Sequence, residues 1–218
     1  MRNILIWGGA GFIGSVLVGK MLNKGYIITV ADNLYKGGDA LLQYVPNKNF
    51  HFKKADISKE EEVKKIHEDI YDGIIILSGI VGVPSCNKTP SLAQAVNVDG
   101  WKYVGRHKGD TKIVAASTGS VYGIVKDQLC NEETPVNPQS LYGITKLKGE
   151  EFILATPNSV ALRFATCAGV SPNMRLNLLP NYMTNEAITN RFLSIFEGNN
   201  MRTFIEIRDF ADSLVYAL

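Results

Sequence analysis

The chain has 218 residues, of which 45% are hydrophobic and 20% are charged. This composition is typical of a globular protein with a sizeable core, and it excludes a disordered or fibrous chain. The 23 basic and 21 acidic side chains are interspersed and leave a formal charge of +2, which argues against a nucleic-acid partner.

Three cysteines, Cys86, Cys130 and Cys167, are far apart and odd in number, which predicts neither a zinc site nor a disulfide framework. The three histidines are scattered, so we expect no metal site. An apolar segment begins at residue 4, which leaves no room for a signal peptide, and no apolar run is long enough to cross a bilayer. We therefore expect a cytoplasmic protein that does not contact a membrane.

Short apolar segments alternate along the chain with segments of helical spacing. The predicted strands cover 4–7, 27–31, 50–52, 73–77, 113–116 and 160–162, and the predicted helices cover 15–23, 58–70, 92–107 and 141–155. Strands that are apolar on both faces need helices on both sides, so this alternation predicts an α/β fold with a doubly wound parallel sheet of Rossmann type. The pattern weakens over 168–200, and a last strand at 203–207 precedes a final helix.

A glycine-rich segment follows the first predicted strand and opens the first predicted helix. Its Gly8, Gly11 and Gly14 allow a tight turn and bring a pyrophosphate close to the helix N-terminus. Asp32 follows the second predicted strand, about twenty residues later, where a carboxylate accepts hydrogen bonds from adenosine ribose hydroxyls. That carboxylate would repel a 2′-phosphate, so the pattern favours NAD, although nearby Lys36 leaves NADP open.

Tyr142 and Lys146 lie four residues apart in a predicted helix, so their side chains share one face. A neighbouring ammonium and a positive nicotinamide favour the phenolate form of a tyrosine, which would make Tyr142 a general base. Ser117 and Thr118 come at the carboxyl end of the fifth predicted strand, where ligands gather in open α/β sheets. Either hydroxyl is suited to hold a reacting hydroxyl group near Tyr142.

Five segments resemble, in the same order, the extended short-chain dehydrogenase/reductase family. They are the Gly8-x-x-Gly11-x-x-Gly14 loop, the Tyr142-x-x-x-Lys146 pair, and the segments 96–100, 117–123 and 162–166. The resemblance covers nearly the whole chain and is greatest to the NAD-dependent nucleotide-sugar epimerases and dehydratases, including UDP-glucose 4-epimerase-like enzymes. It implies that a sugar hydroxyl is oxidised by NAD to a keto-sugar and reduced again on its other face.

The resemblance also implies roles for individual residues. Thr118 would be the catalytic hydroxyl, Tyr142 the base and Lys146 the lysine that binds the ribose. The expected cofactor-binding residues are Gly8, Gly11, Phe12, Ile13, Gly14, Asp32, Asn33, Asp56, Ile57, Leu77, Ser78, Gly79, Asn97, Tyr142, Lys146 and Phe164, and the expected substrate-binding residues are Ser117, Thr118, Asn173, Arg175 and Asn177. The planar guanidinium of Arg175 is suited to a diphosphate.

These assignments divide the chain into an NAD-binding Rossmann domain at 1–167 and a shortened substrate-side region at 168–218 packed on the same domain. Family members usually continue well past the segment that resembles 202–209. We therefore expect the substrate pocket to be reduced, completed by another subunit, or partly lost. The resemblance also implies a homodimer.

Several activities remain open at this point. In the 4,6-dehydratases an Asp-Glu pair follows the catalytic threonine, whereas Gly119 and Ser120 stand there in this chain, which ranks an epimerase above a dehydratase. A reductase or dehydrogenase with net NADH turnover is a further alternative, and so is a non-catalytic NAD-binding module. The last of these has no need for a phenolate base, so the presence of Thr118, Tyr142 and Lys146 together argues against it.

Overall fold

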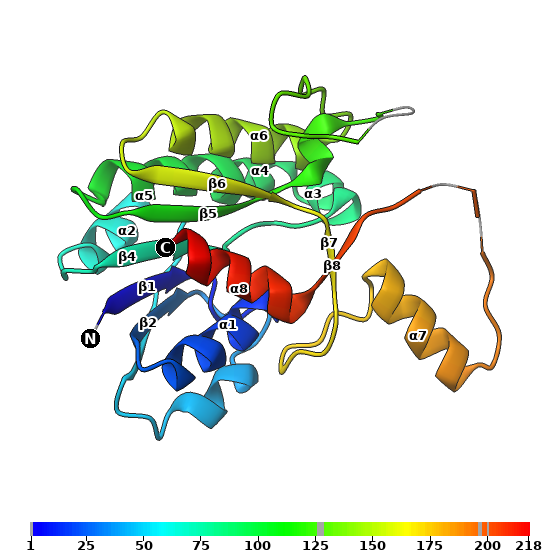
Figure 1. Ribbon diagram of the computed structural model, residues 1–218. Helices are drawn as coiled ribbons and strands as arrows, with labels where there is room; N and C mark the ends of the chain where they lie inside the picture. Colours follow the sequence, from blue (N-terminus) through cyan, green and yellow to red (C-terminus); the bar gives the residue numbers. More distant parts are fainter. Residues whose placement is uncertain (1, 126–128, 196–197, 200) are drawn as a thin grey trace.

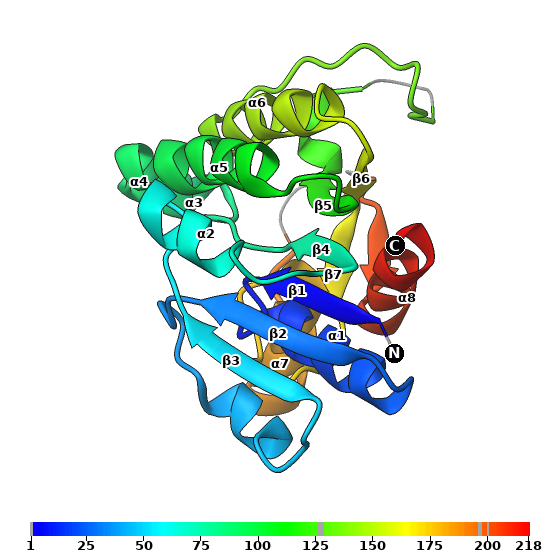
Figure 2. The ribbon, with the colours of Figure 1, turned by 90° about the vertical axis from the view of Figure 1, so that its left-hand side faces the viewer.

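The computed structural model describes residues 2–125, 129–195, 198–199 and 201–218. Its main sheet has six parallel strands in the order β3-β2-β1-β4-β5-β6 and lies between two layers of helices (Figures 1 and 2). The strands are β1 Asn3–Trp7, β2 Ile27–Asp32, β3 Phe50–Lys54, β4 Gly73–Ile76, β5 Ile113–Thr118 and β6 Ser159–Phe164. This topology confirms the predicted doubly wound α/β fold.

Two hydrophobic clusters lie on opposite faces of this sheet, because side chains of a strand alternate between its faces. Ile4 and Ile6 of β1 point to the side covered by α1 and α8, while Leu5 and Trp7 point to the side covered by α2 and α5. All four side chains are fully buried. The helices are α1 Phe12–Asn23, α2 Glu60–Ile66, α3 Val83–Lys88, α4 Pro90–Gln94, α5 Gly100–His107, α6 Leu141–Leu154, α7 Leu179–Thr189 and α8 Ile207–Ala217, with the short helices η1 Asp39–Tyr44, η2 Ala95–Asp99 and η3 Gly119–Tyr122.

The strand order reverses between β1 and β4. From β1 the chain builds outward to β2 and β3, then returns to place β4 on the other side of β1. Ligands of open α/β sheets bind outside the carboxyl ends of the strands at such a switch point. Gly8 directly follows β1 and Leu77 directly follows β4, so the sheet brings these two loops to one place.

Two predicted helices differ from those observed. The predicted helix 58–70 begins at Glu60, because Ser58 is held in a turn in which its amide and hydroxyl both donate to Asp56 Oδ1. The predicted helix 92–107 is interrupted by η2, a π-helical turn, so α4 and α5 are separate regular segments.

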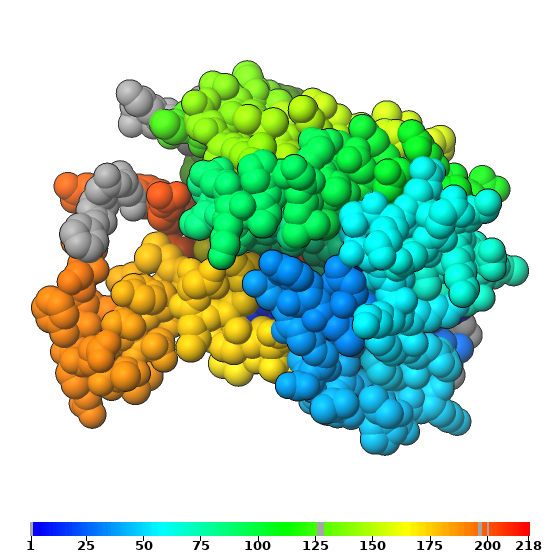
Figure 3. Space-filling view, turned by 180° about the vertical axis from the view of Figure 1, so that it is seen from behind, coloured from blue at the N-terminus to red at the C-terminus, as the bar shows by residue number. Residues whose placement is uncertain are grey.

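The region after β6 contains more regular structure than its sequence pattern predicts. Strand β7 (Thr166–Ala168) and strand β8 (Phe204–Glu206) form a separate two-stranded parallel sheet. Helix α7 lies between them in sequence and stands at one side of the molecule, in orange in Figures 1 and 3. By contrast, α8 packs on α1 against the main sheet. The division of the chain at 167/168 therefore stays a prediction.

In the part of the chain that the structure describes, no helix is both long enough and apolar enough to span a membrane.

Candidate active site

The glycine loop between β1 and α1 is closely packed and has no room for a side chain at Gly8 or Gly14. Gly8 has a φ of +84°, and a Cβ atom there would lie 2.5 Å from the amide nitrogen of Ser78. A Cβ atom at Gly14 would lie 2.5 Å from the carbonyl oxygen of Gly8. Gly11 forms the N-terminal cap of α1, and no side chain caps the helix. The first amides of α1 are therefore free to bind an anion such as a pyrophosphate.

Asp32, at the end of β2, holds this loop in place and can still accept further hydrogen bonds. Its Oδ2 accepts a hydrogen bond from the amide of Ala10 (3.0 Å), and its Oδ1 accepts one from the amide of Leu34 (2.8 Å). Burial raises the pKa of the Asp32 carboxyl, and the two amides partly offset that effect. Each carboxylate oxygen has a second lone pair, so Asp32 can still accept ribose hydroxyls. The loop and Asp32 together fit a dinucleotide.

Asn33 and Asp56, both expected to bind the cofactor, are hydrogen-bonded to each other. Asn33 donates to Asp56 Oδ2 (3.1 Å), while Ser58 donates to Asp56 Oδ1. These hydrogen bonds lower the pKa of Asp56 against the opposing effect of burial, which is the largest single influence. The side chain of Ile57 is buried in the hydrophobic cluster with α5, so only its backbone would be available to a cofactor.

The loop after β4 borders the switch point and is held in place by hydrogen bonds to the side chain of Asn97. Leu77 and Ser78 both donate their amides to the carbonyl oxygen of Trp7. Asn97 lies in the π-helical turn η2 and is fully buried. Its side-chain amide accepts from the amide of Ile80 (2.8 Å) and donates to the carbonyl of Ile80 and to Thr145 Oγ1 (3.0 Å each). Asn97 therefore joins the loop to α6, which differs from the expected direct contact with the cofactor.

Thr118 and Tyr142 come together at the carboxyl edge of the sheet. Thr118 ends β5, and Tyr142 lies in the first turn of α6, whose N-terminus is capped by Ser140 Oγ accepting from the amide of Gly143. Burial raises the pKa of Tyr142, and so does Cys86, while the neighbouring Thr118 hydroxyl and the positive charge of Arg175 act to lower it. The two predicted catalytic hydroxyls are thus adjacent.

Lys146 lies one turn further along α6 and is almost completely buried, at 4% exposure. Its Nζ donates to the carbonyl oxygen of Ala116 (2.7 Å) and lies 3.8 Å from the centre of the Trp101 ring. Burial lowers the pKa of Lys146 to about 7, although the Glu150 carboxylate four residues later acts to raise it. Near neutral pH this side chain is therefore divided between its charged and neutral forms.

Ser117, a candidate substrate contact, is instead part of a buried ionic network. Its hydroxyl donates to the Glu150 carboxylate, which also pairs with Arg163 at 2.6 and 2.8 Å. Arg163 is the cross-strand partner of Ser117 on β6 and donates to the Tyr122 hydroxyl (3.1 Å). Because Ser117 faces α6 rather than the sheet edge, Thr118 is the hydroxyl available to a substrate.

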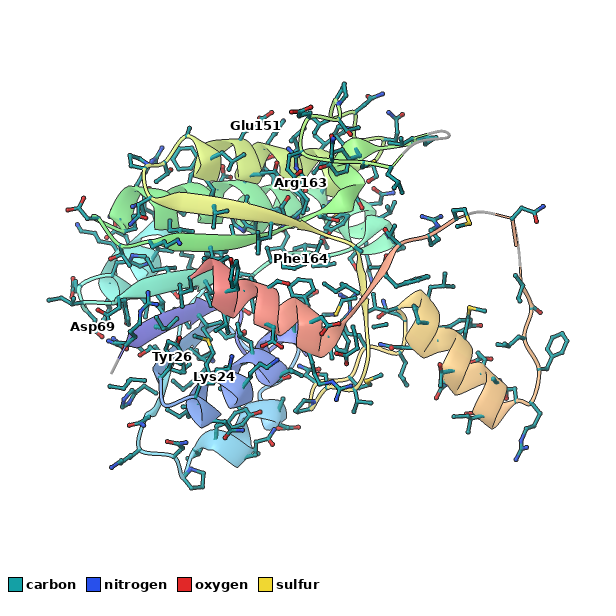
Figure 4. All side chains as sticks on the ribbon, viewed as in Figure 1. Lys24, Tyr26, Asp69, Glu151, Arg163 and Phe164 are labelled. Atoms are coloured by element: carbon teal, nitrogen blue, oxygen red, sulfur yellow. The ribbon has the colours of Figure 1, made fainter. Side chains whose placement is uncertain are left out.

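Phe164, expected at the cofactor, points away from Arg163 to the opposite face of β6 (Figure 4). It is 8% exposed, and its ring stacks on Phe210 of α8 with a centroid distance of 3.5 Å. The side chain therefore belongs to the core between β6 and α8, and only its backbone borders the site.

The three polar residues predicted at the substrate lie in the segment after β7. Asn173 Nδ2 donates to the carbonyl oxygen of Ala10 in the glycine loop (2.8 Å), which places Asn173 beside the cofactor loop. Arg175 lies within electrostatic range of Tyr142, and burial lowers the pKa of its guanidinium. Asn177 is exposed and accepts from Arg175 Nε at 3.4 Å.

Ser171, which the sequence did not indicate, anchors this segment. Its hydroxyl donates to the carbonyl oxygen of Phe12 (2.6 Å) and contacts Ser15 Oγ (3.0 Å). Within the described ranges, no group of three or more His, Cys, Asp or Glu side chains is arranged to hold a metal ion.

A family model described as the NAD dependent epimerase/dehydratase family matches residues 4–218. UDP-glucose 4-epimerase 2 of Oryza sativa subsp. japonica is 29% identical over 252 residues, covering 100% of this chain and 61% of the rice protein. UDP-glucose 4-epimerase of Bacillus subtilis (strain 168) is 31% identical over 250 residues, covering 99% of this chain and 72% of that protein. The chain therefore spans about two thirds of the length of these relatives.

Two solved structures have the same fold. The UDP-glucose 4-epimerase of Thermotoga maritima, solved with UDP-glucose, has a TM-score of 0.89 and 26% identity, covering 99% of this chain and 73% of that one. The UDP-glucuronic acid 4-epimerase of Bacillus cereus, solved with NAD, has a TM-score of 0.86 and 27% identity, covering 99% and 72%.

Proposed function

Because this chain belongs to the NAD-dependent epimerase/dehydratase family, we propose that it epimerises a nucleotide sugar through a transient keto-sugar. The observation that carries the proposal is that the Thr118 and Tyr142 hydroxyls are neighbours at the carboxyl edge of the sheet, beside a glycine loop that fits a dinucleotide. The 4-epimerase names of the relatives support it.

We assign the cofactor site to residues around the switch point. The first amides of α1 would hold the pyrophosphate, Asp32 the adenosine ribose and Lys146 the nicotinamide ribose. When bound, NAD supplies the acceptor for the hydride that leaves the sugar carbon, and then returns that hydride. The carbonyl oxygen of Ala116 takes one donor of Lys146, so the ammonium would approach the ribose from a fixed position.

The chain's own contribution is to bind, orient and move a proton. Thr118 would hold the sugar hydroxyl against Tyr142, and the Tyr142 oxygen would accept its proton as the carbon is oxidised. When the keto-sugar is reduced on its other face, Tyr142 returns the proton to the oxygen. Since burial holds Tyr142 in its phenol form, the positive charge brought by the bound nicotinamide ring is needed to favour the phenolate.

An epimerase is favoured over a dehydratase by the residues that follow Thr118. Elimination of water needs a second acid and base, but Gly119 and Ser120 carry no carboxyl group. The amide of Ser120 donates back to Thr118 Oγ1 (3.2 Å), and the nearby carboxylate of Glu150 is engaged by Arg163.

The identity of the sugar and its nucleotide, a homodimeric assembly and a cytoplasmic location remain predictions. The cysteines within the described ranges are all free, which supports a reducing compartment.

The test is to incubate the purified protein with NAD and a panel of UDP-, GDP- and dTDP-sugars, following both sugar products and NADH absorbance. We expect an epimer to accumulate without net NADH. Tyr142→Phe, which keeps the ring but loses the hydroxyl that takes up the proton, should lower turnover by about 100-fold or more. Net NADH change would instead indicate a reductase, loss of water a dehydratase, and NAD binding without any turnover a non-catalytic module.

A further inference from the structure

Trp101 contacts both Lys146 and the loop after β4. The proposed chemistry gives this side chain no role. It lies in the first turn of α5 and is fully buried. One face of its indole ring carries the Lys146 ammonium, 3.8 Å from the ring centre. Its Nε1–H donates to the carbonyl oxygen of Ser78, 3.2 Å away, in the loop that borders the switch point.

The three donors of the Lys146 ammonium explain why the indole matters. One N–H bonds to the carbonyl oxygen of Ala116, and the ring of Trp101 takes the place of a second acceptor. That leaves one N–H for a ligand. A cation over an aromatic face is held best by tryptophan and holds more strongly when it is removed from water.

The indole lies in a closely packed contact between α5 and α6. A Cβ atom at Gly149 would lie 2.2 Å from the carbonyl oxygen of Asn97 and 3.2 Å from the Trp101 ring. The lack of a side chain at Gly149 therefore lets α6 approach η2 and α5 closely enough for the lysine to sit on the ring. An aliphatic side chain at position 101 would not attract the ammonium, because it has no aromatic face.

We propose that Trp101 is a positioning residue for the cofactor. Its ring holds the Lys146 ammonium in place for a ribose hydroxyl, and its N–H fixes the Ser78 carbonyl in the loop beside the cofactor. The inference rests on the proposed function in that Lys146 is taken to bind NAD. Two ionisable groups also act on the Lys146 ammonium, namely Glu150 of the same helix and Cys86 of α3.

The chain's two tryptophans make the contact measurable without a substrate. Trp7→Phe leaves Trp101 as the only indole, and its emission should change as the pH is raised from 6 to 9 and the ammonium loses its proton. Adding Lys146→Met should abolish that change, whereas adding Cys86→Ser should preserve it. A pH-dependent emission that persists without Lys146, or no change at all, would overturn the proposal.

The second measurement is the Kd for NAD by calorimetry. Trp101→Leu removes both interactions and should weaken binding about tenfold, and Trp101→Phe, which keeps a ring but loses the N–H, should weaken it about threefold. Trp7→Phe is the matched control, because Trp7 is an equally buried indole whose N–H bonds to His67 instead, and its Kd should stay within about twofold.

The outcomes separate this inference from the proposed function. A folded Trp101→Leu protein that binds NAD as the wild type does would refute the role of Trp101, whether or not the enzyme is an epimerase. If the leucine variant does not fold, the phenylalanine variant decides. If the wild-type protein binds no NAD, the proposed function fails, and the fluorescence titration still decides whether Trp101 holds the Lys146 ammonium.

Discussion

Replacing Lys146 by methionine should make the free protein more stable near neutral pH. The buried ammonium is costly, because burial lowers the pKa of Lys146 from 10.5 to about 7. In the unfolded chain the side chain regains its ordinary pKa and takes up a proton readily. At any pH below about 10, the uptake of that proton therefore stabilises the unfolded state relative to the native state.

The sign and size of the effect follow from proton linkage. A base whose pKa is lowered by folding destabilises the native state progressively as the pH falls from the unfolded value to the folded one. Between pH 9.5 and pH 7, Lys146 should therefore lower the free energy of unfolding by roughly 2–3 kcal/mol. Loss of the hydrogen bond to Ala116 and of the contact with Trp101 offsets part of the gain in the methionine variant at either pH.

The measurement is urea unfolding of the nucleotide-free wild type and of Lys146→Met at pH 7 and pH 9.5. The difference in unfolding free energy between the two proteins should shift in favour of methionine by roughly 2–3 kcal/mol at the lower pH. Lys148→Met, at a neighbouring position of the same helix, is the control and should show no comparable shift. A difference that is the same at both pH values would mean that Lys146 is not held as a buried, partly neutral amine.

Three further predictions concern other parts of the site and core. Gly14→Ala places a Cβ atom 2.5 Å from the Gly8 carbonyl oxygen, so the loop must shift, and the Kd for NAD by calorimetry should rise at least about tenfold; unchanged affinity would contradict the packing argument. Glu150→Gln leaves the Arg163 charge without its partner and should lower the free energy of urea unfolding by about 3 kcal/mol, while a loss below about 1 kcal/mol would show the pair to be solvated. Burial lowers the pKa of His67 to about 4, so the unfolded chain takes up a proton from about pH 6.5 downward and the native state does not. The free energy of unfolding should therefore fall by about 2 kcal/mol between pH 7 and pH 4.5 in the wild type, and His67→Gln should remove that part of the slope in parallel urea titrations.

The sequence predicted the sheet well because its strands are short, mostly apolar segments. Each of the six predicted strands is found in the main sheet. The less regular segment after β6 was harder, because α7 carries Pro180 in its first turn and has many exposed apolar side chains, which hide a helical period.

The predicted site residues lie where the glycine loop and the carboxyl ends of β4 and β5 meet, but sequence did not reveal which way each side chain points. Ser117 and Thr118 are adjacent hydroxyl residues that the sequence does not distinguish. The structure does, because Ser117 bonds to Glu150, which in turn pairs with Arg163. Glu150 had a usable signal, since it lies four residues after Lys146 on the same helical face. Trp101 had none, because its contact with Lys146 depends on how two separate helices pack.

Because residues 95–99 form a π-helical turn, the structure of this segment depends on its exact number of residues. Such a turn holds one residue more than an α-helical turn, so losing a single residue here would let α4 and α5 merge into one regular helix. The helical segments on either side of the turn would keep nearly the same relative rotation, because a π-helical turn takes up its extra residue locally. Asn97 lies within this turn and would lose the backbone position from which it bonds to the loop after β4, so a one-residue deletion here should be incompatible with the site.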